Sequence, residues 1–199
     1  MSPLLDGLSD AQRDLLVERE QPGSTRPMLA TLTHDPFDDD DWIYERKLDG
    51  VRLLVFRKGG EVRLTSRNGK DRSATWFEVR DAFEAMDGPD LVVDGEVVAF
   101  SGDVTSFRRL QTRMQVQHED EARERARRVT VYFYAFDLLH LDGFDVTALP
   151  LAARKSLLRK ALEFSDPVRW TPHRRGNGLE YLEEACGKGW EGLIAKRSG

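Results

Sequence analysis

Alternating hydrophobic and polar positions predict a series of β-strands from Trp42 onward. Apolar and β-branched residues dominate each strand candidate, and the one that alternates most regularly follows a Gly59-Gly60 hairpin turn. The candidates are Val51 to Phe56, Glu61 to Ser66, Leu91 to Phe100, Val129 to Leu139 and a short final strand, Gly192 to Lys196.

Apolar residues at helical spacing predict helices between these strands. They are Thr75 to Met86, much of Thr105 to Arg128, Leu151 to Phe164 and Gly178 to Gly187. Near the N-terminus, Ser9 and the apolar residues up to Val17 predict a capped amphipathic helix that ends before Pro22. We therefore expect a helical appendage over residues 1–24 and one main domain over residues 25–199.

The order of elements predicts the fold class. Hairpins and intervening helices do not alternate as regularly as they do in a doubly wound sheet. We expect an α+β fold with mostly antiparallel β-sheets flanked by helices. With 199 residues, of which 40% are hydrophobic and 33% charged, the chain is long enough for a sizeable core.

Composition then limits the function. The net charge of −5 excludes a uniformly basic nucleic-acid-coating protein, although the arginines between Arg108 and Arg128 leave direct DNA contact open beside a solvated, ion-paired face. A single cysteine, Cys186, excludes an internal disulfide. Since we find neither a bilayer-length apolar run nor a secretory pattern, we expect a cytoplasmic protein without membrane contact.

Three carboxylates interrupt the apolar strands. They are Asp94, Glu96 and Asp137. Because burying an unpaired carboxylate costs several kcal/mol, we expect each to be paired, exposed at a strand end or bound to a cation. Strand alternation places Glu45 and Lys47 on one face. The run Asp38 to Asp41 is interpreted as a solvated turn, and the scattered histidines lack the spacing of a zinc site.

The run Glu45 to Arg52 resembles the lysine motif of the covalent nucleotidyltransferases, which comprise ATP-dependent DNA ligases, RNA ligases and capping guanylyltransferases. Later runs resemble that superfamily's other motifs, in the same order. They are Ser66 to Gly69, Asp94 to Glu96, Tyr134 to Leu139 and Glu191 to Lys196. The residues of these motifs are most similar to those of bacterial ATP-dependent DNA ligases, including the ligase module of end-joining proteins. It implies the covalent nucleotidyltransferase (ATP-grasp-like) fold.

The resemblance also implies a role for each motif residue at the start of the site. Lys47 would attack the α-phosphorus of ATP and carry AMP covalently. Glu45 would read the adenine amino group. Asp49 and Gly50 would make the turn after the lysine, the glycine permitting close backbone approach to the nucleotide. Ribose and phosphate oxygens would be held by the guanidinium groups of Arg52 and Arg67.

The later motifs imply the rest of the site. Glu96 and Glu191 would hold the nucleotide sugar and a divalent cation, Mg²⁺ or Mn²⁺. Phe136 would stack on the base, although an aromatic residue in an apolar strand is often part of the core. Lys196 would lie near phosphate, yet strand alternation would turn it away from Glu191.

The function that the resemblance implies is the adenylation domain of an ATP-dependent DNA ligase, which forms lysyl-AMP for transfer to the 5′-phosphate of a DNA nick or break in repair and recombination. The implied partners are nicked or broken duplex DNA and end-joining proteins, and we expect a nucleoid-associated monomer. In the family, a Lys-x-Lys motif and an OB domain follow, whereas this sequence stops at Gly199. We therefore expect an incomplete, weakly active ligase. The alternatives are an RNA ligase or guanylyltransferase, or a degenerate nucleotide- or DNA-binding module without catalysis.

Overall fold

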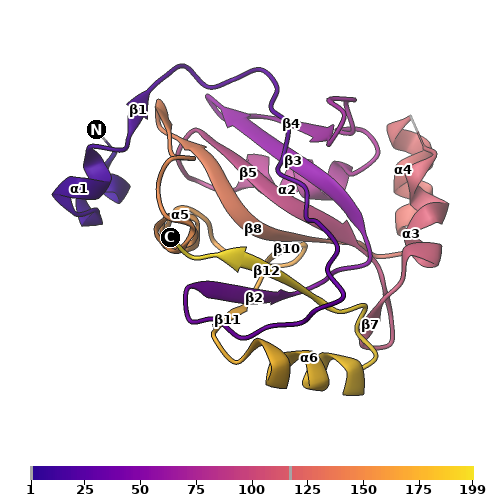
Figure 1. Ribbon diagram of the computed structural model, residues 1–199. Helices are drawn as coiled ribbons and strands as arrows, with labels where there is room; N and C mark the ends of the chain where they lie inside the picture. The colour runs from indigo at the N-terminus through magenta and orange to yellow at the C-terminus, as the bar shows by residue number, and fades with distance from the viewer. Residues whose placement is uncertain (1, 117) are drawn as a thin grey trace.

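A large twisted β-sheet forms the centre of the computed structural model, which describes residues 2–116 and 118–199 (Figure 1). Within those residues it has seven strands, in the order β1-β9-β8-β5-β3-β4, with β10 paired to β8. All of these pairs are antiparallel except β10 with β8. The strands are β1 (Val17–Glu18), β3 (Val51–Lys58), β4 (Glu61–Ser66), β5 (Leu91–Val98), β8 (Tyr132–Leu141), β9 (Phe144–Asp145) and β10 (Val168–Trp170).

A smaller antiparallel sheet of three strands lies next to the large one, in the order β11-β2-β12. Figure 1 shows it below the large sheet, with helix α6 on its far side. A two-stranded hairpin, β6 with β7, follows β5. The elements are β2 (Trp42–Arg46), β11 (His173–Arg175), β12 (Leu193–Arg197), α6 (Gly178–Gly187), β6 (Phe100–Ser101) and β7 (Val104–Thr105).

The main core lies between one face of the large sheet and the helices that cover it. Alternate strand residues such as Leu53, Val93 and Phe133 pack with Phe83 of α2 (Phe77–Ala85) and Leu158 of α5 (Leu151–Ala161). The intervening residues of β3 and β5 therefore point to the opposite face. The other helices are the 3₁₀-helix η1 (Pro3–Gly7) and the α-helices α1 (Asp10–Arg13), α3 (Phe107–Met114) and α4 (Glu119–Ala126).

The predicted α+β class with mostly antiparallel sheets is confirmed. The predicted strand Glu61 to Ser66 and the predicted helix Gly178 to Gly187 have those same bounds in the structure. The hairpin before β4 turns at Gly59 and Gly60, whose φ angles of 59° and 85° favour glycine.

The N-terminal helix prediction is wrong in its length. The predicted cap is present, because Ser9 and Gln12 form a capping box, but α1 ends at Arg13. Val17 instead lies in strand β1 and pairs with Asp145, which gives its backbone a partner at the edge of the large sheet. Leu5 is fully buried within the main core, so the N-terminal residues pack on the rest of the chain. The predicted domain boundary at residue 24 stays a prediction.

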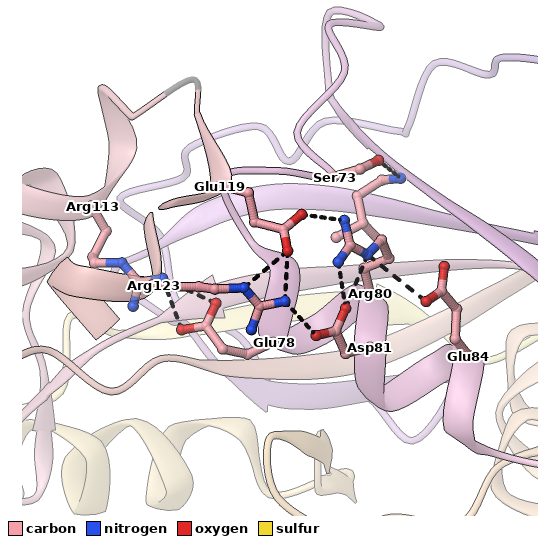
Figure 2. Close-up of polar contacts among 9 residues, drawn as sticks. Ser73, Glu78, Arg80, Asp81, Glu84, Arg113, Glu119 and Arg123 are labelled. Atoms are coloured by element: carbon pink, nitrogen blue, oxygen red, sulfur yellow. Dashed lines mark hydrogen bonds and ion pairs between the residues drawn. The ribbon is translucent and has the colours of Figure 1, made fainter. Parts of the chain in front are cut away.

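Ion pairs hold α2, α3 and α4 together, and they involve two arginines of the predicted basic cluster, Arg113 and Arg123 (Figure 2). Arg123 pairs with Glu119 and with Asp81, at 2.5 and 3.3 Å. Arg113 is fully buried and pairs with Glu78 at 2.8 Å. For Arg113 and Arg123, these contacts favour the interpretation as ion-paired side chains over side chains that are free to bind phosphates.

The ion pairs of Glu119 with Arg80 and Arg123 predict a contribution to stability that is lost in acid (Figure 2). Hydrogen bonds from Arg80 and then Arg123 lower the pKa of Glu119 from 4.5 to about 2. Because the folded-state pKa lies below the unfolded one, the stabilisation is present above pH 4.5 and is lost as the pH falls toward 2. We expect Glu119→Gln to lower the melting temperature slightly at about pH 7 and to have less effect at about pH 3.

Thermal unfolding followed by circular dichroism at both pH values measures this change. Glu121→Gln is the matched control, because Glu121 pairs with Arg125 within α4 and does not connect α4 to α2. A melting-temperature difference for Glu119→Gln that is the same at both pH values would contradict the prediction.

Candidate active site

The predicted site residues converge from both sheets. Glu45 and Lys196 come from β2 and β12 of the small sheet, and Arg52, Glu96 and Phe136 come from β3, β5 and β8 of the large one. The sheets meet where Lys196 Nζ lies 4.2 Å from the centre of the Phe136 ring. Residues separated by more than 100 positions therefore line one site.

Lys47 lies just after β2, at an open position. Its backbone N–H donates to the carbonyl of Gly192 at 2.9 Å, which continues the pairing of β2 with the chain before β12. Its ammonium forms an ion pair with Glu191. Since their side chains are 39% and 43% exposed, both groups are accessible to a ligand from solvent.

The bend after Lys47 is fixed by the neighbouring elements. The Asp49 carboxylate accepts a hydrogen bond from the Phe107 N–H at 2.9 Å, and the Asp49 N–H donates to Thr105 Oγ1 at 3.2 Å. At Gly50, a Cβ atom would lie 2.3 Å from the carbonyl oxygen of Val97. The glycine is therefore required by close packing against β5, a reason different from the approach to nucleotide that the resemblance implies.

Gly50→Ala is expected to lower the free energy of unfolding by about 1–3 kcal/mol, because the added methyl group would push the bend away from β5. It should also slow any reaction of Lys47, which the bend positions. Urea unfolding measures the first effect. Gly187→Ala is the control, since a Cβ atom there meets nothing within 4 Å. Equal stability of the two variants would show that the bend can move without cost.

Two carboxylates on the large sheet, Asp94 and Asp137, are paired with arginines, which is one of the three outcomes expected for them. Arg52 binds both oxygens of Asp94, at 2.5 and 2.6 Å, and also donates to the carbonyl of Met28 at 3.3 Å. Asp137 is bound in the same two-pronged way by Arg154, at 2.8 and 2.9 Å. Both ion pairs satisfy charges that strands would otherwise bury alone.

Glu96 is a third carboxylate of the large sheet, and it lies near Lys47. Register places it directly opposite Arg52. Burial raises its pKa from 4.5 to about 7, while Arg52 and Lys47 oppose that shift and Glu191 adds to it. Glu96, Lys47 and Glu191 are thus within electrostatic reach of one another.

The donor set formed by Glu96 and Glu191 suits a hard cation such as Mg²⁺, which prefers oxygen ligands and retains water or phosphate partners. Among the residues that the structure describes, no group of three or more histidines, cysteines, aspartates or glutamates is arranged to hold a metal ion. A cation held here would therefore draw its other ligands from outside these side chains.

At the other end of the site, Glu45 is buried and faces two cations. Its Oε2 atom lies 2.6 Å from Lys196 Nζ, and its Oε1 atom lies 2.6 Å from Lys155 Nζ. The Phe136 ring lies below both Lys196 and Arg52, whose guanidinium carbon is 4.6 Å from the ring centre. Lys196 therefore lies with the predicted base-reading residues.

Strand alternation predicted that Lys196 is turned away from Glu191, and the structure does not follow that alternation. Glu191 and Gly192 precede β12, and Gly192 has a φ of 143°, so the alternation does not extend back to Glu191. Lys196 pairs across the sheet with Ile43, which lies on the same face of β2 as Glu45. Arg67 is exposed in the turn after β4, at the end of the sheet where β3 begins.

Sequence reasoning missed Lys155 and Arg154, which approach the site from α5. Lys155 occupies a position of the apolar stripe of its helix, four residues after Leu151 and three before Leu158. A lysine at such a position signals a buried partner. That signal was available in the sequence, but the identity of the partner was not.

No helix in the described part of the chain is both long and apolar enough to cross a membrane.

Comparison with known proteins gives concordant matches. Residues 27–199 match the family described as ATP dependent DNA ligase domain. The SPbeta prophage-derived DNA ligase-like protein LigB of Bacillus subtilis is 32% identical over 175 residues, which cover 86% of this chain and 60% of that protein. The multifunctional non-homologous end joining DNA repair protein LigD of Mycobacterium tuberculosis is 36% identical over 173 residues, which cover 86% of this chain and 21% of LigD.

A solved structure described as mycobacterial DNA ligase D complexed with ATP and MES has the same fold. It matches with a TM-score of 0.67 and 31% identity, over 87% of this chain and 54% of that one. The predicted nucleotidyltransferase fold is thereby confirmed. The chain spans 60% or less of the length of these relatives.

Proposed function

The chain belongs to the ATP-dependent DNA ligase domain family, and on that premise we propose that it performs the adenylation step of such a ligase. One observation carries this proposal. Lys47 is accessible, bonded to Glu191 and near Glu96, while a buried carboxylate and an aromatic ring, Glu45 and Phe136, form a separate base-binding end. A nucleotide whose base is bound at the Glu45 end would have its α-phosphate near the Lys47 amine.

In the proposed step, the Lys47 amine attacks the α-phosphorus of ATP. A bond forms between Nζ and phosphorus, the bond from phosphorus to the bridging oxygen breaks, and pyrophosphate leaves with that electron pair. The amine must lose protons to become the nucleophile and then the phosphoramidate. Glu191 forms an ion pair with Lys47 Nζ and is therefore positioned to accept one of these protons.

The other residues bind and orient. Glu45 accepts from the exocyclic amine of adenine, and Phe136 offers its ring to the base. Glu96 and Glu191 are the proposed ligands of Mg²⁺ or Mn²⁺, which would neutralise phosphate charge. The roles of Arg52, Arg67 and Lys196 toward sugar and phosphate oxygens also stay proposals. Arg52 is presently bonded to Asp94, and that pair holds its guanidinium beside the ring.

The direct test is the intact mass of the chain after incubation with ATP and Mg²⁺. We expect a gain of one adenylyl group, located at Lys47 by peptide mapping. Nucleotide binding without any covalent gain would instead support a degenerate binding module. A covalent gain from GTP that exceeds the gain from ATP would support a guanylyltransferase.

The proposed acceptor of the adenylyl group is a 5′-phosphate at a nick or break in duplex DNA, where the protein would act in repair within the cytoplasm. The name of the mycobacterial relative places that protein in end joining. To test the transfer, the adenylated chain is first separated from pyrophosphate and then added to a nicked duplex, and AMP on the DNA is measured. If a 5′-phosphorylated RNA accepted AMP and the nicked DNA did not, an RNA ligase would be the better assignment.

A further inference from the structure

Lys155 lies beneath the base-binding end of the site and is almost fully buried, with 1% of its surface exposed. Its ammonium donates to Glu45 Oε1 at 2.6 Å, to the Phe136 carbonyl at 3.2 Å and to the Thr171 carbonyl at 3.4 Å. An ammonium has three N–H donors, so these acceptors account for all of them. One buried cation therefore connects both sheets at the base-binding end.

The two cations on Glu45 are not equivalent. The Lys155 side chain is 2% exposed and that of Lys196 is 23% exposed. A ligand that enters from solvent meets Lys196 first and can displace it, whereas Lys155 has no comparable access. Lys155 is thus the partner that keeps the buried Glu45 carboxylate paired and oriented when a base arrives.

Lys155 also supports the strand segment that presents the aromatic ring. The pairing of β5 with β8 passes from Asp94 opposite Asp137 to Gly95 opposite Ala135, so Phe136 is skipped in the register of these two strands. Such a bulge re-aims a side chain and leaves backbone groups outside the ladder. The carbonyl of the bulged Phe136 accepts from Lys155 instead.

We propose that Lys155 is a positioning residue that sets the base selectivity of the site, by holding the Glu45 carboxylate in fixed relation to Phe136. This inference rests on the adenylation proposed above. A carboxylate fixed in this way accepts a hydrogen bond from a purine with an amine at position 6 and repels a purine with a carbonyl oxygen there. Adenine has the amine, and hypoxanthine has the carbonyl.

A purely structural role predicts something different. Lys155 Nζ lies 4.5 Å from the centre of the Trp170 ring, so its removal also disturbs packing. Lost packing would lower stability and slow the reaction of every nucleotide to the same extent. The ratio of rates for two bases separates positioning from packing.

The experiment compares the complete chain with Lys155→Met and Lys160→Met, each with ATP and with inosine triphosphate, and measures the rate of covalent adduct formation. Lys160 is the control because it is an exposed lysine on the same helix. We expect the ATP-to-ITP rate ratio to fall about tenfold or more in Lys155→Met and to be unchanged in Lys160→Met. Equal slowing with both nucleotides, or a wild-type ratio near one, would overturn the inference. Absence of any adduct in the wild-type chain would overturn the proposed function as well.

Thermal unfolding of each variant shows whether it folds. If Lys155→Met does not fold, Glu45→Gln is compared with Glu45→Gln/Lys155→Met, which removes both buried charges together. Because Lys155 acts through Glu45, the two should have the same reduced rate ratio. A wild-type ratio in Glu45→Gln, or a further fall in the double variant, would contradict the inference.

Discussion

Replacing Lys47 with alanine is expected to reduce the rate of adenylate formation by at least about 10³-fold, because the variant lacks the nucleophile itself. Folding should be retained, since 39% of the side chain is exposed and its partner Glu191 is equally open to water. Intact mass measured over time with ATP and Mg²⁺ gives the rate, and thermal unfolding gives the stability.

Two further variants make the result specific. Lys160→Ala removes an exposed lysine from α5 and should leave the rate unchanged. Lys47→Arg keeps the positive charge beside Glu191 but offers a group that stays protonated, so it should be as inactive as Lys47→Ala. Persistent adduct formation in either Lys47 variant would place the covalent bond on another side chain.

Asp94→Ala is expected to lower the free energy of unfolding by about 3 kcal/mol, because it leaves the Arg52 guanidinium without its two-pronged partner in a largely buried position. The side chains of Asp94 and Arg52 are 4% and 23% exposed, so water can compensate only in part. Urea unfolding at neutral pH measures the change. ATP binding should weaken as well, because Arg52 would no longer be held over the Phe136 ring.

The double variant Arg52→Met/Asp94→Leu tests the cause. It removes both charges and fills the space with apolar atoms, so its stability should return to within about 1 kcal/mol of the wild-type value while ATP binding stays weak. If Asp94→Ala is as stable as wild type, the ion pair is not what holds this face of the sheet. If the double variant is as unstable as the single one, lost packing is the cause.

The parts of the fold that were predicted correctly are those with strong local signals. Strand β4 alternates between polar and apolar residues from Glu61 to Leu64, and α6 has apolar residues at helical spacing over ten residues. Strands such as β1, β6 and β9 have two residues each, which is too short for any periodic pattern to be recognised. Their backbones are ordered by distant partners that no local rule reveals.

The same limit applies to the site. Lys47 is found because its motif is contiguous. A partner for Asp94 and a partner for Asp137 were among the expected outcomes, because a lone buried charge is costly. The identities of their partners depend on register and tertiary packing. Lys155 is 110 residues from Glu45, and the reason for Gly50 lies in the backbone of β5. Spacing alone cannot supply such contacts.

Strand β2, which carries Glu45, has both of its neighbours far along the chain from it, at β11 and β12. During synthesis on a ribosome, β2 emerges with no strand to pair with until residues 173–197 have followed it. The large sheet can pair β3, β4 and β5 long before that point. The base-binding end is therefore expected to assemble later than β3, β4 and β5, and a nascent chain to capture nucleotide only after β12 has left the exit tunnel.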